Sequence, residues 1–417
     1  MLHVDKPDSM MTEPICMTAT SLVPDKTYEI LLKLNHSIGT LYGRGHFKAD
    51  SRGVIDLAKT APLRGTYSGV RPMGLFESLT PSDDYRFGSY CKCTPPEPFH
   101  FVLELYDDVG KLVHSLPLLK RWMHPAVVRR EIEEDGICGT LFLPPGEGPF
   151  PTILDMSGTG GGINEHKGAT LSSEGFCVLS LAFFQYKSLI EDMNELDMDY
   201  FKKAIDWLIS QPFTRNEIGI QGVSFGGLLV NMLAVRHPEI IAVCSINGSH
   251  CLSDVAKIKE HGKFLPYVGT AVNMLQYING AMCFSKAVQY MDVSEEADIK
   301  IETAPKRTAF RFVGSLDDLS TPTVFCSRLA EKKLKESGHY VEVDFAPGGH
   351  LMEPPYYPGL PVVYSKFAGT MQAYGGEPSQ HGASQPRVWA NTVSFFKRFL
   401  GDTKPLPDYR QELRSHL

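Results

Sequence analysis

The stretch Ile218–Leu229 reads IGIQGVSFGGLL, in which a short apolar run leads into one serine that is surrounded by glycines. Its central residues, Gly222 to Gly226, match the pattern G-x-S-x-G. In this pattern the serine occupies a sharp, strained turn between a strand and a helix, and the glycines let the two backbones approach closely. We therefore predict that Ser224 is a nucleophile rather than a structural turn residue. The next backbone N–H, that of Phe225, is then one expected donor of an oxyanion hole.

Apolar runs of strand length alternate with helical stretches on both sides of this serine. The runs are PTILDMSG, GFCVLSLAF, IGIQGVS, IAVCSING, TAFRFVG and YVEVDFA, and the stretches with helical spacing are DYFKKAIDWLIS, TVFCSRLAEKKLKES and RVWANTVSFFKRFL. The preceding segment RREIEEDGICGTLFLPP indicates a hairpin. Continuous apolar strands that alternate with helices predict a mostly parallel sheet covered by helices on both faces.

A serine hydroxyl needs a base to take its proton, and the base needs an orienting carboxylate. In a sheet of this kind the expected chain order is serine, acid, histidine. His350 follows the last apolar strand, in YVEVDFAPGGHLMEPP, and is the predicted base. The loop in FRFVGSLDDLSTP offers two acids. We favour Asp317, which lies three residues after Gly314, and keep Asp318 as the alternative, since it could instead cap a helix or stand in a solvated turn.

The remaining histidines suit the role of base less well. His339 begins a strand, His237 ends a helix, His381 is expected in a polar loop, and His250 and His261 precede the acid. These positions leave His350 as the predicted base.

A second oxyanion donor is expected after the first parallel strand, in LDMSGTGGGINEH. Gly158, Thr159 and Gly160 are the candidates, because glycines free backbone N–H groups to approach a developing negative charge. A nucleotide-binding loop is the rival interpretation, but the G-x-G-x-x-G spacing and a following Gly-Lys-Ser/Thr are both missing. No H-E-x-x-H or clustered Cys/His pattern occurs, so neither a metal nor a cofactor is expected.

The chain before about Tyr106 has period two instead. Tyr28, Ile30, Leu32 and Leu34 alternate with more polar residues, and turn signals such as DSRG and CTPPEP separate such runs. This pattern predicts an antiparallel sandwich of roughly 120 residues. The segment KLVHSLPLLKRWMHPAV is expected to connect it to the second half.

Composition excludes several classes of protein. The chain has 417 residues, 43% of them hydrophobic, and a formal charge of −7, so a nucleic-acid partner is not expected. No uncharged apolar run is long enough to span a membrane, and the first residues have no apolar core of a secretory signal. The nine scattered cysteines are expected to be free thiols of an intracellular protein.

The motifs together resemble those of the type I acyl-CoA thioesterases and the related bile acid-CoA:amino acid N-acyltransferases. The similar segments are GTYSGVRPMGLFESLTP, GTLFLPPGEGPFPTILDMSGTGGG, GVSFGG, INGS and GHLMEPPYYP, in this order along nearly the whole chain. The resemblance implies an immunoglobulin-like N-terminal sandwich over residues 1–125 and an α/β-hydrolase domain over residues 126–417. It also implies a triad of Ser224, Asp317 and His350, although GSLDDLS has one residue more before its aspartate pair than relatives have.

The resemblance implies that the substrate is a fatty acyl-CoA. Ser224 would attack the thioester, CoA would leave as a thiol protonated by His350, and water would hydrolyse the acyl-serine. Conjugating members of the family carry cysteine at the position of Ser224, so a serine favours hydrolysis. Transfer of the acyl group to glycine or taurine is the alternative, and a non-catalytic acyl-CoA binder is a third.

Two further segments have expected roles. The last three residues, Ser415, His416 and Leu417, resemble the S-K-L peroxisomal address, so we expect a peroxisomal protein recognised by the import receptor, with the cytosol as the alternative. The segment from about Cys251 to Thr303 interrupts the strand–helix rhythm and is expected to cap the pocket. Its stretch AVNMLQYINGAMCF either lines an acyl channel or belongs to an ordinary core.

Overall fold

The computed structural model describes residues 1–411. Its second half is built on an eight-stranded sheet whose strands lie in the order β11-β12-β14-β13-β15-β16-β21-β22. The strands are β11 (Val128–Glu134), β12 (Ile137–Leu143), β13 (Thr152–Met156), β14 (Cys177–Ala182), β15 (Ile218–Val223), β16 (Ile240–Ile246), β21 (Ala309–Ser315) and β22 (Val341–Ala346). β11 and β12 form the predicted antiparallel hairpin, and β13 to β22 all pair in parallel.

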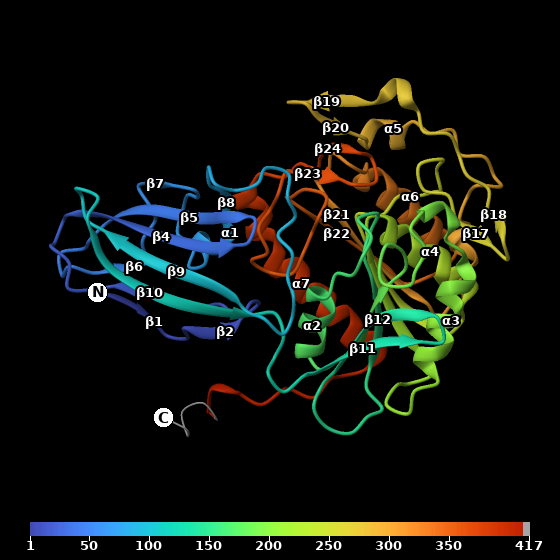
Figure 1. Cartoon of the computed structure of the whole chain (residues 1–417), viewed down its shortest axis with the longest axis horizontal. Coiled ribbons are helices and arrows are strands. Elements are labelled where there is room, and N and C mark those ends of the chain that lie inside the picture. Colours follow the sequence, from blue (N-terminus) through green and yellow to red (C-terminus); the bar gives the residue numbers. More distant parts are fainter. Residues whose placement is uncertain (412–417) are drawn as a thin grey trace.

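Numbered from β11, this order is 1-2-4-3-5-6-7-8 with the second strand antiparallel to its neighbours, which is the arrangement of the α/β hydrolases. Helices cover both faces of the sheet (Figure 1). They are α2 (His166–Ser173), α3 (Met198–Ile209), α4 (Phe225–Arg236), α6 (Thr323–Glu336) and α7 (Pro378–Leu400). The prediction of a mostly parallel sheet covered on both faces is confirmed.

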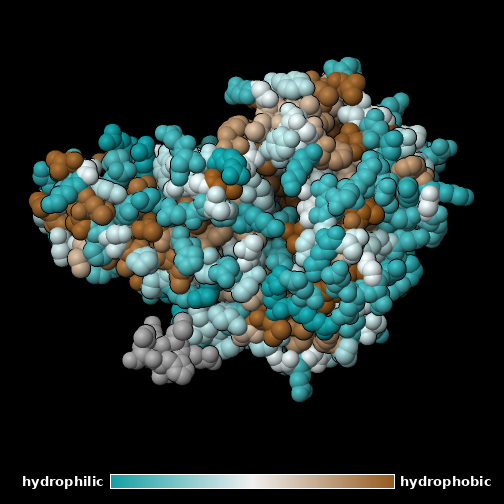
Figure 2. Space-filling view, in the orientation of Figure 1, coloured by the Kyte–Doolittle hydropathy of each residue, from teal (hydrophilic) through white to brown (hydrophobic). Residues whose placement is uncertain are grey.

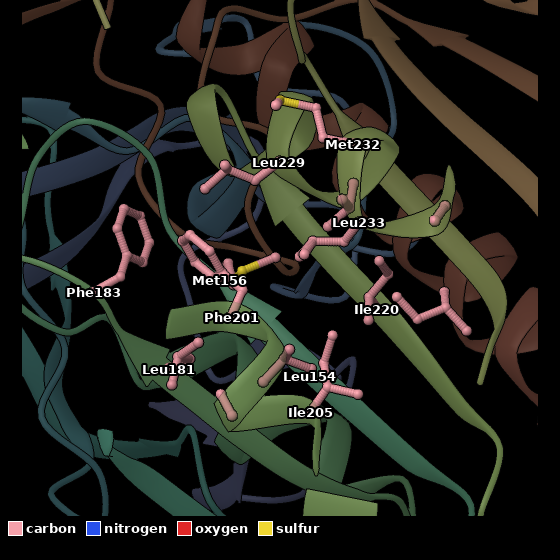
Figure 3. Close-up of a cluster of buried hydrophobic side chains, with 14 of the residues drawn as sticks. Leu154, Met156, Leu181, Phe183, Phe201, Ile205, Ile220, Leu229, Met232 and Leu233 are labelled. Atoms are coloured by element: carbon pink, nitrogen blue, oxygen red, sulfur yellow. The ribbon is translucent and has the colours of Figure 1, made fainter. Parts of the chain in front are cut away.

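Neighbouring residues of the strands enter different cores, as the pleat requires. Ile153 packs with residues of α2 and α7, whereas Leu154 packs with α3 and α4. Figure 3 shows part of the second core, where Leu154 and Ile220 of the sheet lie near Ile205 of α3. Each such fully buried side chain contributes about 1.5–3 kcal/mol of transfer free energy. These cores fix the edge at which the strands end, and thus the loops that carry the site.

Helix α3 shows how the sequence determines one of these elements. The side chain of Asp197 caps it by accepting from the N–H of Asp199 at 3.0 Å. The predicted apolar stripe is buried throughout, including Phe201, Ile205 and Leu208. The helix therefore stands where the 3.6-residue periodicity placed it.

The N-terminal region consists of β-strands and one short helix. Its elements are β1 (Leu2–Val4), β2 (Asp8–Met10), β3 (Met17–Ala19), β4 (Thr27–His36), β5 (Gly39–Lys48), β6 (Ile55–Asp56), β7 (Arg64–Gly65), α1 (Gly74–Glu77), β8 (Thr80–Pro81), β9 (Phe99–Tyr106) and β10 (Leu112–Arg121). They form a three-stranded sheet, β1-β3-β6, and a seven-stranded sheet, β2-β10-β9-β4-β5-β7 with β8 on β5. Apart from the parallel pair β2–β10, the named pairs are antiparallel.

The strand prediction for this region is right for β4, but the expectation for the segment that follows β9 is wrong. The alternating residues Tyr28, Ile30, Leu32 and Leu34 are all buried. The expected connector KLVHSLPLLKRWMHPAV instead forms strand β10 from Leu112 to Arg121, paired with β9 on one side and β2 on the other. The connection to the second half begins only after Arg121.

The two regions share side chains across their boundary. Trp122 lies against Tyr357 and His166, with ring centroids 6.2 and 5.6 Å apart. Arg71 donates to the hydroxyl and carbonyl oxygens of Ser379 at 2.7 and 2.8 Å. The N-terminal core therefore continues into the second half of the chain.

The last described residues return to the N-terminal region. Arg410 donates to both carboxylate oxygens of Glu13 at 2.9 and 3.0 Å, and the hydroxyl of Tyr409 lies 3.1 Å from a carboxylate oxygen of Asp8. The tail thus fastens the end of the α/β region to the first strands of the chain. The expected targeting tripeptide Ser415–Leu417 lies outside the described residues.

An insertion between β16 and β21 stands outside the main sheet, above its carboxyl edge (Figure 1). It contains β17 (Lys259–Glu260), β18 (Lys263–Phe264), η2 (Val272–Met274), β19 (Gln276–Ile278), β20 (Ala281–Cys283), α5 (Ser285–Gln289) and η3 (Ile301–Thr303). β20 joins β24 (Thr370–Ala373) and β23 (Val362–Ser365) in a second sheet, β19-β20-β24-β23. Apolar residues gather on the surface of this part (Figure 2), where Val272 and Ile278 are exposed.

The remaining short helix, η1 (Met193–Glu195), precedes α3. Within residues 1–411, no helix combines the length and the apolar character needed to cross a membrane.

Candidate active site

Ser224 is the residue between β15 and α4, and its backbone has φ +60° and ψ −121°. A non-glycine residue adopts such a conformation only when its surroundings enforce it. Here the close packing of β15 and α4 enforces it. A Cβ on Gly222 would overlap the backbone of Gly226, and a Cβ on Gly226 would overlap the carbonyl of Ser157. Both glycines are therefore required by space, which is the physical reason for the G-x-S-x-G pattern.

His350 lies beyond β22 and contacts the serine. Its Nε2 is 2.8 Å from Ser224 Oγ, and its Nδ1 is 2.7 Å from Oδ2 of Asp318. Since a carboxylate can only accept, Nδ1 carries the proton and Nε2 of the neutral ring accepts from the serine hydroxyl. The histidine is 2% exposed. This is the hydrogen-bonding order that a general base for serine requires.

The acid in contact with His350 is Asp318, and the expectation that favoured Asp317 is wrong on this point. β21 ends at Ser315, and the loop then turns Asp317 into solvent and Asp318 inward. Oδ1 of Asp318 accepts from the backbone N–H groups of Ser320 and Thr321, both at 2.8 Å. The inward acid is therefore the fourth residue after Gly314 rather than the third.

Asn247, just after β16, connects the acid loop with the histidine loop. Its side-chain nitrogen donates to the carbonyl of His350 at 2.6 Å and to the hydroxyl of Ser315 at 2.9 Å, and its oxygen accepts from the N–H of Ser315 at 2.8 Å. The sequence motif INGS contains this residue, but no local spacing indicates its role. The parallel pairing of β16 with β21, and of β21 with β22, brings Asn247, Ser315 and His350 together.

His381 supports the same histidine loop from α7. It was expected in a polar loop, which is wrong: it lies inside α7 and is 3% exposed. Its Nδ1 accepts from the N–H of Gly349 at 3.0 Å. Burial lowers the pKa of His381 to about 4, so the ring is neutral at pH 7 and keeps this acceptor.

The residues predicted for the oxyanion hole lie around Ser224. Phe225 is the first residue of α4, where backbone N–H groups have no partner within the helix. Gly158 is in contact with the serine, since a Cβ added to it would lie 3.3 Å from Ser224 Oγ. Thr159 borders, together with Ser224, both cavities described below, and Gly160 borders the larger one.

Two cavities meet at Ser224. The larger is a cleft of about 470 Å³ that lies between the loop Gly158–Asn164, the hairpin β23–β24 and the N-terminal residues Tyr90 and Lys92. The smaller has about 110 Å³ and is mainly apolar. It is lined by residues of α4 and of the insertion, among them Leu228, Phe284, Val288 and Met291. The insertion thus covers one side of the serine, as expected of a cap.

A buried ionic cluster borders the cleft. Glu353 is ion-paired with Lys167, and its carboxylate lies 2.9 Å from Nε2 of His166. Burial alone would raise the pKa of Glu353, but the adjacent charges of Lys167 and His166 outweigh this and hold it below its usual value. The sequence signal for this cluster is Glu353 itself, a charged residue three positions after His350 in the otherwise apolar stretch GHLMEPPYYP.

No metal centre is found in the part of the chain that the structure describes, since its His, Cys, Asp and Glu side chains form no group of three that could hold an ion. The nine cysteines are free thiols, and eight of them are buried.

Comparison with known proteins agrees with this architecture. Residues 12–134 match the model of the acyl-CoA thioester hydrolase/BAAT N-terminal region, and residues 196–402 match that of the BAAT/acyl-CoA thioester hydrolase C terminal. Acyl-coenzyme A amino acid N-acyltransferase 1 of Mus musculus is 32% identical over 403 residues, which cover 94% of this chain and 96% of that protein. Acyl-coenzyme A thioesterase 5 of Mus musculus is 31% identical and covers 96% of each chain. The peroxisomal succinyl-coenzyme A thioesterase of Mus musculus is also 31% identical and covers 95% of each. The chain belongs to the acyl-CoA thioester hydrolase/BAAT family.

Proposed function

We propose that this protein is a serine thioesterase that hydrolyses fatty acyl-CoA to a free fatty acid and CoA. The observation that carries the proposal is the continuous hydrogen-bonded chain from Ser224 through His350 to Asp318. A protein that only binds acyl-CoA has no chemical need for this chain. The names of two of the family relatives, acyl-coenzyme A thioesterase 5 and peroxisomal succinyl-coenzyme A thioesterase, add support.

The first half of the reaction forms an acyl-serine. Ser224 Oγ attacks the thioester carbon while His350 Nε2 takes the hydroxyl proton, and the imidazolium that results is stabilised by Asp318. The backbone N–H groups of Phe225 and Thr159 are the proposed donors to the oxyanion, with Gly158 and Gly160 giving the loop its freedom. When the carbon–sulfur bond breaks, the thiolate of CoA takes the proton back from His350 and leaves as a thiol.

The second half regenerates the enzyme. A water molecule, deprotonated by His350, attacks the acyl-serine through the same oxyanion, and Ser224 leaves with the proton of the imidazolium. The products are a fatty acid and the original triad. Hydrolysis needs only the groups already described.

Acyl transfer to an amino acid is the second candidate, because one of the relatives at this level of similarity is named an acyl-coenzyme A amino acid N-acyltransferase. The first half of the reaction would be the same. The amine of glycine or taurine would then replace water as the nucleophile that attacks the acyl-serine, and His350 would take its proton.

The test measures CoA release from acyl-CoAs of medium to very long chain length, with and without glycine or taurine, for the wild type and Ser224→Ala. We expect amine-independent release that falls by on the order of 10⁴ in Ser224→Ala. Ser210→Ala, at the end of α3 away from the cleft, is the matched control and should retain wild-type activity. Formation of an N-acyl amino acid would favour the second candidate, and release that persists in Ser224→Ala would refute both.

We further propose that the chain divides at about residue 125, into an immunoglobulin-like sandwich (1–125) and a catalytic domain (126–417). The two sheets of the N-terminal region, which share no strand with the eight-stranded sheet, support this division. We also propose a peroxisomal location, addressed by Ser415–Leu417 through the import receptor, since one relative is named peroxisomal. Deletion of these three residues from a fluorescent fusion should move the protein to the cytosol.

A further inference from the structure

The charge of the cleft beside Ser224 differs in sign from that of the protein as a whole. Three charged residues line it: Lys92, Lys366 and Glu353. The carboxylate of Glu353 is neutralised by its ion pair with Lys167 and lies 2.9 Å from Nε2 of His166. Within residues 1–411, neither Lys92 nor Lys366 has an acidic partner within ion-pair distance, and both are exposed. The accessible charge of the cleft is therefore positive, although the chain as a whole carries −7.

The two lysines come from different regions that are joined at this place. Lys92 belongs to the N-terminal loop that follows Gly88, and Lys366 follows strand β23. The N–H of Tyr364, in β23, donates to the carbonyl of Gly88 at 2.7 Å. Tyr90 and Tyr364 also line the cleft. One wall thus presents two cations and two aromatic side chains.

The cavity on the other side of Ser224 has the opposite character. Its lining includes Phe225, Leu228, Val288 and Met291, and none of its lining residues is charged. An acyl chain gains free energy by leaving water for such a site, whereas a phosphate would lose its hydration without meeting a cation. The two cavities therefore distinguish the two ends of an acyl-CoA molecule.

We propose that Lys92 and Lys366 form a subsite for the phosphate groups of CoA, so that the substrate lies with its nucleotide in the cleft and its acyl chain under the insertion. This inference rests on the proposed function and specifies the orientation of its substrate. Ammonium groups bind phosphate by charge-assisted hydrogen bonds, and the tyrosine rings offer surfaces for the adenine. In this arrangement the N-terminal region takes part in substrate binding.

The experiment compares two substrates with the same acyl chain. One is the acyl-CoA, and the other is the acyl thioester of N-acetylcysteamine, which has the reacting bond but no phosphate. Lys92→Gln, Lys366→Gln and the double variant are measured against Lys203→Gln, an exposed lysine of α3 that forms no ion pair with any residue of the described range 1–411. Thermal unfolding of each variant verifies that it is folded.

For acyl-CoA we expect KM to rise about threefold to tenfold in each single variant and further in the double variant, with kcat little changed. The N-acetylcysteamine thioester should be hydrolysed equally by all variants. Adenosine 3′,5′-bisphosphate, which carries phosphates of CoA without the thiol, should inhibit the wild type competitively and the double variant much less. Added salt should weaken this inhibition in the wild type.

Two results would overturn the assignment. Equal losses with both substrates would mean that the lysines support the structure of the cleft, and an unchanged KM for acyl-CoA would place the phosphates elsewhere. In both cases hydrolysis that still depends on Ser224 would leave the proposed function standing. Absence of Ser224-dependent hydrolysis in the wild type would instead remove the proposed function itself.

Discussion

The carboxylate of Asp318 has little freedom, because both of its oxygens are engaged. Oδ1 accepts hydrogen bonds from two backbone N–H groups, and Oδ2 accepts one from the Nδ1–H of His350. An amide in its place could present an N–H to Nδ1 and so favour the tautomer in which Nε2 carries the proton. That tautomer cannot accept the proton of Ser224.

We therefore expect Asp318→Asn to lower kcat by on the order of 10³–10⁴, with little change in the free energy of unfolding. The neighbouring variant Asp317→Asn, at an exposed position, should stay within about twofold of the wild type. Steady-state hydrolysis of one acyl-CoA at pH 7.5 measures both. A large loss in Asp317→Asn with little loss in Asp318→Asn would contradict the geometry of the loop.

These two aspartates also mark the limit of what local sequence can predict. Ser224 and His350 were predictable because each has a local signature: glycines required by space, or a position just beyond the last strand among small residues. The choice between Asp317 and Asp318 depends on how three residues turn after β21, and both side chains have the same chemistry. Asn247 has no local signature, since its contacts connect segments far apart in the chain. Lys92 has none either, because the cleft that it lines is formed by distant segments.

At the scale of elements, strands with a local sequence pattern could be predicted, whereas a strand that depends on distant contacts could not. The buried strands of the α/β region are continuous apolar runs, so their positions could be read from the sequence. Strand β10 was missed because one of its inward positions is a lysine. Lys120 is fully buried and donates to the hydroxyl of Ser9 at 2.9 Å and to the carbonyl of Glu13 at 2.7 Å. Its partners come from a distant segment, so the charge breaks the expected apolar pattern.

Helix α7 gives the fold a pH dependence through His381. Burial lowers its pKa to about 4, whereas an unfolded histidine titrates near 6.5. Between these values the unfolded chain binds more protons than the folded one, so the free energy of unfolding falls as the pH falls from 6.5 to 4. The contribution of one such group is at most about 1.4 kcal/mol per pH unit.

His381→Asn keeps a side-chain acceptor for the N–H of Gly349 but cannot titrate. We expect its free energy of unfolding to decline less steeply with acid than that of the wild type, by up to about 1.4 kcal/mol per pH unit. Urea unfolding at several values between pH 7 and pH 4.5 measures the two slopes. All other histidines are present in both proteins, so parallel slopes would show that His381 makes no such contribution.

At the scale of the whole molecule, the two regions are not independent. Tyr356, Tyr357, Leu360 and Val363 of the second half are buried in the same cluster as the N-terminal strands. Their exposure to water would cost about 1.5–3 kcal/mol for each side chain. The total for these four side chains is similar in size to the whole free energy of unfolding of a typical domain.

We therefore expect residues 126–417 produced alone to be insoluble or to lack a cooperative thermal transition. The full chain should unfold in one calorimetric transition whose calorimetric and van't Hoff enthalpies agree. Soluble yield and differential scanning calorimetry of both proteins test this, and coexpression with residues 1–125 is the control that should restore solubility. A soluble fragment with its own sharp transition would show that the second half folds independently.

The hydrogen bond from Tyr364 to Gly88 closes one wall of the cleft across both regions. A molecule bound against that wall therefore acts as a reversible cross-link between them. At a concentration of 100 times its Kd, such a ligand would add about 2.7 kcal/mol to the free energy of unfolding. Both regions would be stabilised together. Resistance to a protease should then increase at cleavage sites in both halves of the chain at once. Such protection could serve as a screen that finds ligands of the cleft without requiring any turnover.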